Sequence, residues 1–193
     1  LEVQCHAGAV VSPAGGAGRW VAQGQGALRL LLFAGCDDAD LDRALGTTRR
    51  RTLRGLRQER MLHGRRLDRR MAALETPEPV LDRAFAWARV RLDSFLAETP
   101  GLGRSLMAGY GESRPGWADG RPGYAWYFGR DACWTAFATL AMGDNGIARD
   151  VIRFLARHQD VTGKVLHEYT TSGLVHYDAA DSTPLFLLLA GRY

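Results

Sequence analysis

The first 36 residues alternate between apolar and polar positions. Leu1, Val3 and Cys5 alternate with polar neighbours, and a second apolar run, residues 27–35, follows the glycine-rich stretch at residues 11–18. Such alternation predicts short β-strands separated by turns. Because a few strands alone would expose unpaired edges, we predict that residues 1–36 are the remnant of a β-sandwich.

A helical pattern replaces the alternation after residue 37. The segment DDADLDRAL opens with carboxylates, which is typical of a helix start, and residues 49–70 are dense in arginine. We predict an arginine-rich helical linker over residues 37–75. Contact with phosphate or nucleic acid is the functional alternative to a solvated helical face, although no aromatic residue is interleaved for base stacking.

Apolar residues at helical spacing predict about four further helices, at residues 76–99, 132–142, 145–158 and 184–190. The second is apolar around nearly its whole circumference, Trp134 included, so we expect it to be an inner helix. Gly143 ends this helix, Asn145 caps the third, and Asp181 or Ser182 caps the fourth.

Two long connectors, residues 101–130 and 160–181, lie on either side of the predicted helix pair 132–142 and 145–158. A turn of about three residues joins these two helices, so they must be antiparallel neighbours. The connector before the pair and the connector after it are therefore expected to meet at the same end. Both connectors are rich in aromatic residues and carboxylates, and loops of this length are usually functional.

The sequence WYFGRD, from Trp126 to Asp131, contains the most suggestive chemistry in the chain. Aromatic faces stack on the C–H faces of a sugar ring, while a guanidinium and a carboxylate bind its hydroxyl groups. The structural alternative is that Asp131 caps the following helix and pairs with Arg130 on the surface. The composition of the second connector favours the sugar-binding interpretation.

Other polar residues have simpler alternatives. His158 is expected to interact with the C-terminal dipole of its helix, and Asp178 and Asp181 to cap the last helix. Trp117 is either a sugar platform or an anchor of its loop. His167 and His176 lie nine residues apart without any closely spaced ligand pair, so we predict no metal site.

Two longer segments, YAWYFGRDACWTAFATLAMGD and GKVLHEYTTSGLVHYDAADSTPLFLLL, resemble the glycogen-debranching amylo-α-1,6-glucosidase group and its glucoamylase-like relatives. The resemblance covers residues 123–193. It implies a mainly α fold, with residues 76–193 forming part of an (α/α)6 barrel preceded by a β-sandwich. It also implies a substrate site that contains Trp126, Arg130, Asp131, His167, Glu168, Tyr177 and Asp178, to which we add Asp181 and Trp117 as candidates.

The reaction implied by the resemblance is inverting hydrolysis of an α-glucan. This needs a protonated carboxylic acid and a carboxylate roughly 6.5–9.5 Å apart. In the relatives both groups lie on later loops, so we expect them beyond residue 193, with Glu168 and Asp131 as the candidates within the chain. The alternatives are a trehalase-like or mannosylglycerate-hydrolase-like enzyme, or a non-catalytic helical protein associated with nucleic acid.

Composition narrows these interpretations. Three scattered cysteines without CxxC spacing argue against disulfides and structural zinc, and suit a reducing, cytoplasmic compartment. No apolar run reaches the length of about 18 residues that a membrane span needs. The net charge is +4, and both chain ends look cut, so we expect a fragment. The expected partner is an oligosaccharide or α-glucan, with no cofactor, nucleic acid or membrane.

Overall fold

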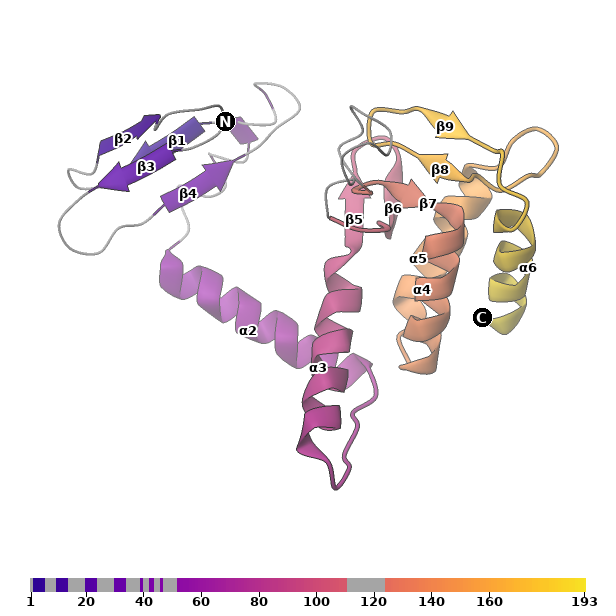
Figure 1. Cartoon of the computed structure of the whole chain (residues 1–193), viewed down its shortest axis with the longest axis horizontal. Coiled ribbons are helices and arrows are strands. Elements are labelled where there is room, and N and C mark those ends of the chain that lie inside the picture. Colours follow the sequence, from indigo (N-terminus) through magenta and orange to yellow (C-terminus); the bar gives the residue numbers. More distant parts are fainter. Residues whose placement is uncertain are drawn as a thin grey trace. The chain divides into compact units, whose positions relative to one another are not determined.

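The computed structural model describes residues 2–5, 10–13, 20–23, 30–33, 39, 42, 43, 46, 52–110 and 124–193. The chain divides into two compact units, residues 1–60 and residues 61–193. Within the described residues the protein is mainly helical, with small antiparallel sheets. Figure 1 shows the elements of each unit.

The first unit contains two antiparallel strand pairs. β1 (Glu2–Cys5) pairs with β4 (Leu30–Phe33), and β2 (Val10–Pro13) pairs with β3 (Trp20–Gln23). Strands at both predicted apolar runs are thereby confirmed. β2 includes residues 11–13 of the glycine-rich stretch that was expected to be a turn, so that prediction is wrong for these three residues.

Helix α2 (Leu53–Arg70) lies in the predicted arginine-rich linker and ends on the core of the second unit. Leu67 and Met71 are buried there, and the amide of Ala72 donates to the carbonyl of Met142 over 2.6 Å. Most of the described arginines of this helix are exposed, which gives it a solvated basic face.

Helix α3 (Pro79–Ser94) is shorter than the apolar pattern indicated. The prediction that it continues to residue 99 is wrong, because β5 (Leu96–Thr99) and β6 (Gly103–Leu106) form an antiparallel hairpin in its place. Pro100 and Gly101 supply the turn, and Gly101 has a φ of 80° that favours glycine. The apolar residues at the end of the predicted helix therefore lie in strand β5.

Three helices complete the second unit: α4 (Gly129–Ala141), α5 (Asn145–Arg157) and α6 (Ser182–Arg192). Gly143 has a φ of 86°, as expected of the residue after a helix end. The cap of α5 is one residue earlier than predicted, because Asp144 Oδ1 accepts from the amides of Gly146 and Ile147. The third predicted helix is otherwise confirmed, with His158 at its C-cap.

Only one side of α4 is buried, so the prediction of a helix buried all round is wrong. Ala132, Cys133 and Ala136 face the core, whereas Trp134 is 59% exposed. The core of this unit is built mainly by side chains of α4, α5, α6 and the segment before β8. Leu67 of α2, Met71 directly after α2 and Leu106 of β6 complete it. Its largest fully buried members include Tyr127, Leu106, Ile147, Leu155, Leu166 and Leu189.

Candidate functional site

A three-stranded sheet joins the two long connectors. β7 (Tyr127–Phe128) pairs with β8 (Glu168–Tyr169), which pairs with β9 (Val175–His176). Figure 1 shows this sheet at the end where α4 begins, α5 finishes and α6 begins. The expectation that both connectors meet at one end of the helix pair is thus confirmed.

Gly129 makes the closest approach between these segments. Its amide donates to the carbonyl of His167 over 2.9 Å, and its missing side chain leaves room for the carbonyl of Leu166 and for Ser182. A Cβ at this position would lie 2.9 Å from Ser182 Oγ and still closer to the Leu166 carbonyl oxygen. The glycine of WYFGRD therefore docks the start of α4 against the second connector and α6.

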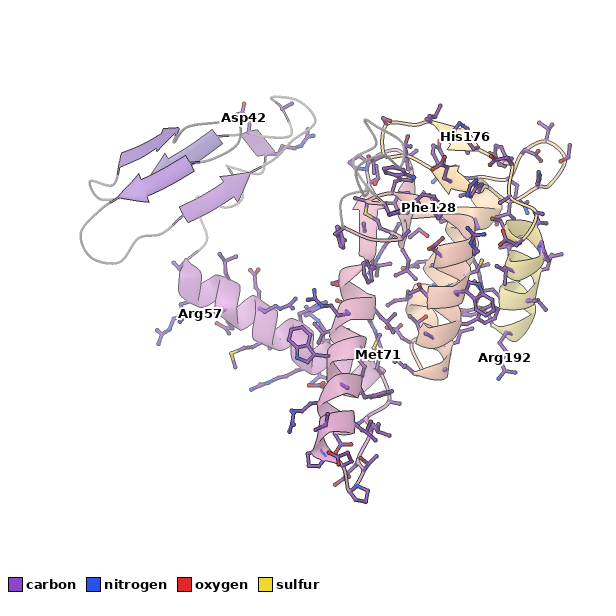
Figure 2. All side chains as sticks on the ribbon, in the orientation of Figure 1. Asp42, Arg57, Met71, Phe128, His176 and Arg192 are labelled. Carbon is purple, nitrogen blue, oxygen red and sulfur yellow. The ribbon has the colours of Figure 1, made fainter. Side chains whose placement is uncertain are left out.

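Trp126, the residue before β7, and Glu168 of β8 form a buried polar pair. The Trp126 indole Nε1 donates to Glu168 Oε2 over 3.0 Å, and Glu168 Oε1 lies 2.8 Å from His176 Nδ1. Glu168 is only 5% exposed, and the Trp126 ring stacks on Phe128 with centroids 5.6 Å apart. Phe128 and His176, labelled in Figure 2, mark this end of the molecule. His176 was not among the predicted site residues.

Arg130 bonds to Asp181 across 51 residues of sequence. Its Nη1 donates to Asp181 Oδ2 over 2.8 Å, which corrects the expected pairing of Arg130 with Asp131. This hydrogen bond is the main cause that lowers the pKa of Asp181 and raises that of Arg130. Asp181 occupies the N-cap position of α6 but its side chain makes no capping hydrogen bond, and its Oδ1 is buried without a hydrogen-bond partner.

The alternative prediction that Asp131 caps the following helix is wrong. The N-cap of α4 is Phe128, and Asp131 lies within the first turn, half-buried. A carboxylate there interacts favourably with the positive end of the helix dipole.

His167 and Asp178 form a second, more exposed pair. His167 Nδ1 lies 2.7 Å from Asp178 Oδ1, and the His167 ring meets the edge of Phe128. The hydrogen bond from His167 lowers the pKa of Asp178. His167 also lowers the pKa of Asp181 through its charge, more weakly than Arg130 does.

Not every predicted residue joins this cluster. The Tyr177 hydroxyl donates to the carbonyl of His158 over 2.9 Å, so it ties the second connector to the end of α5. The His158 ring Nε2 lies 2.9 Å from the Leu102 carbonyl oxygen. Trp117 lies outside the described residues. Tyr124, which the prediction left out, is 38% exposed beside Phe128; its position in an aromatic-rich connector was the signal for it.

A thiol nucleophile and a bound metal ion are two further chemistries that such a cluster could support. Burial, followed by the charge of Asp181, raises the pKa of Cys133 to about 12, so its thiol is not a nucleophile at neutral pH. No group of three or more His, Cys, Asp and Glu side chains among the described residues could hold a metal ion. None of the described helices combines the length and apolar character that a bilayer crossing requires.

No family model, curated protein or solved structure matches this chain. The resemblance to debranching and glucoamylase-like enzymes therefore stays a hypothesis about the cluster described above.

The ion pair between Arg130 and Asp181 has a pH signature. The pKa of Asp181 is lower in the folded state than in the unfolded state, so its stabilisation is complete above the unfolded-state pKa and is lost as the pH falls through the folded-state value. We expect Arg130→Met to raise the pKa of Asp181 toward its ordinary value, as followed by the ¹³C chemical shift of its carboxyl group. Asp178 should titrate unchanged in this variant, and an unchanged Asp181 titration would contradict the pairing.

Proposed function

We propose that residues 124–181 bind the terminal sugar of an α-glucan, as part of a glycoside hydrolase of debranching or glucoamylase type. The observation that supports this most is the antiparallel pairing of β7 with β8, which brings the aromatic–Arg–Asp motif next to the second carboxylate-rich connector. Helix capping alone does not account for this gathering of aromatic, cationic and anionic groups at one end of a helix pair.

The accessible groups of the cluster have the donors and acceptors that a sugar needs. The side chains of Arg130 and Asp181 are 49% and 43% exposed, and those of His167 and Asp178 are 28% and 75% exposed. Guanidinium and carboxylate groups form charge-assisted hydrogen bonds with hydroxyl groups. The exposed Tyr124 ring is the stacking surface in this arrangement.

Buried members of the cluster have a supporting role in the proposal. Trp126 is 7% exposed, so the ring that was expected to contact the substrate acts instead through its hydrogen bond to Glu168. Glu168 in turn orients His176. The proposed reaction is inverting hydrolysis, and we assign neither its acid nor its base to a described residue.

Binding of maltooligosaccharides tests the proposal directly. We expect maltotetraose to quench the tryptophan fluorescence of the protein, and Arg130→Ala or Asp181→Ala to weaken this binding at least about tenfold, because each removes a charge-assisted hydrogen bond. Both side chains are half exposed, so the variants should remain folded.

Arg83→Ala is the matched control, since it removes an exposed arginine from α3. It should bind maltotetraose as the unchanged protein does. Quenching that persists equally in Arg130→Ala and Asp181→Ala would refute the site, and salt-sensitive binding of DNA in place of glucan would favour the nucleic-acid alternative.

A further inference from the structure

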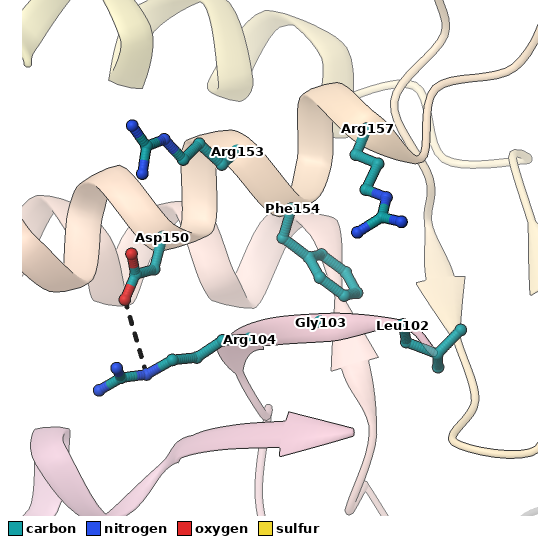
Figure 3. Close-up of a pocket in the computed structure, with 7 residues that line it drawn as sticks. All are labelled: Leu102, Gly103, Arg104, Asp150, Arg153, Phe154 and Arg157. Carbon is teal, nitrogen blue, oxygen red and sulfur yellow. Dashed lines mark ion pairs between the residues drawn. The ribbon is translucent and has the colours of Figure 1, made fainter. Parts of the chain in front are cut away.

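A separate cleft lies between the start of β6 and helix α5. Its volume is about 180 Å³, and Figure 3 shows the residues that line it. The floor consists of Leu102, Gly103 and the ring of Phe154. Gly103, the first residue of β6, has a φ of 113° that favours glycine, and without a side chain it contributes only backbone to the lining.

Arginine dominates the charged lining of this cleft. Arg104 comes from β6, while Arg153 and Arg157 are one helical turn apart on α5 and therefore share a face. Arg104 and Asp150 lie on one side of the Phe154 ring and Arg157 on the other (Figure 3).

Only part of this positive charge is neutralised. Asp150 Oδ2 lies 3.5 Å from Arg104 Nε, and Asp150 is the one carboxylate in the lining. Arg153 and Arg157 have neither a hydrogen bond nor an ion pair with any described side chain. Their guanidinium groups point to opposite sides of the Phe154 ring, Arg153 toward the side of Asp150 and Arg157 away from it (Figure 3), so each can offer its N–H donors to an anion.

We propose that this cleft binds a phosphate group, either as free phosphate or as a phosphate monoester. Three guanidinium groups and one carboxylate leave a net charge that matches a phosphate dianion. The planar fork of arginine suits the oxygens of phosphate, which accept paired N–H donors. Leu102 and Phe154 offer an apolar surface to the carbon skeleton of an ester. This site is distinct from the sugar-binding cluster and does not depend on the function proposed for it.

Isothermal titration calorimetry at low ionic strength tests this assignment with three probes: inorganic phosphate, a hexose 6-phosphate and acetate. We expect saturable binding of a phosphate-bearing probe, with Arg153→Gln and Arg157→Gln each weakening it about tenfold. Tighter binding of the hexose phosphate would identify an ester as the ligand, and equal binding would identify the free ion. Both arginines are exposed, so their replacement should leave the fold intact, which circular dichroism would verify.

Arg83→Gln, with the same loss of charge on α3, should bind within twofold of the unchanged protein. The proposal is overturned if neither phosphate probe binds, if acetate binds as tightly as phosphate, or if Arg83→Gln weakens binding as much as Arg153→Gln.

Discussion

Replacing Gly129 with alanine should destabilise the second unit by about 3 kcal/mol, the largest effect we expect from a single added methyl group. The new Cβ would overlap the carbonyl oxygen of Leu166 and press on Ser182. Neither neighbour can move easily, because one is backbone and the other is the fully buried first residue of α6. Urea denaturation followed by far-ultraviolet circular dichroism would measure the loss.

Gly64→Ala provides the matched control for this substitution. Gly64 lies within α2, and a Cβ added there would have no neighbour within 4 Å, so alanine should stabilise the helix by about 0.5–1 kcal/mol. If the two variants were equally stable, the close docking of α4 against the second connector would be refuted.

Asp144→Ala should cost about 2–3 kcal/mol, because this fully buried carboxylate has two structural roles. Its Oδ1 caps α5, and its Oδ2 lies 2.6 Å from Arg70 Nε, an ion pair without hydrogen-bond geometry. The Arg70 side chain is 43% exposed and also lies 3.4 Å from Asp93, which limits the loss. Urea denaturation of the variant would measure it.

Asp144→Asn separates the two roles. The amide oxygen can still cap α5, so this variant should lose about 1 kcal/mol less than Asp144→Ala. A double-mutant cycle with Arg70→Met should give a coupling of at least about 0.5 kcal/mol. Strictly additive effects would show that Arg70 and Asp144 do not interact, and would contradict the anchoring of α2 on this core.

Local sequence signals predicted several features of the second unit. The apolar spacing placed α5 correctly, and Gly143 marked the end of α4, because helix periodicity and caps depend on residues within one or two turns. The short turn between α4 and α5 also predicted that the two connectors meet at one end. That inference needed only the antiparallel geometry of a helix hairpin, and the β7–β8 pairing agrees with it.

Residues 95–106 show where local pattern was insufficient. Phe95 continues the apolar spacing of α3, yet the chain leaves the helix there and forms the β5–β6 hairpin. The choice depends on burial of Leu106 in a core to which other segments contribute, and periodicity cannot report such long-range packing.

The sequence by itself determined where most of the helices lie, that Gly143 follows the end of α4, and that the two chemically rich connectors share an end. Only the tertiary structure decided the partners within that end: Arg130 bonds to Asp181 and not to its neighbour Asp131, and Trp126 is buried against Phe128 while Trp134 is exposed. The physical reason is that side-chain partners and burial depend on contacts between residues tens of positions apart, whereas caps, turns and periodicity are satisfied within a few residues.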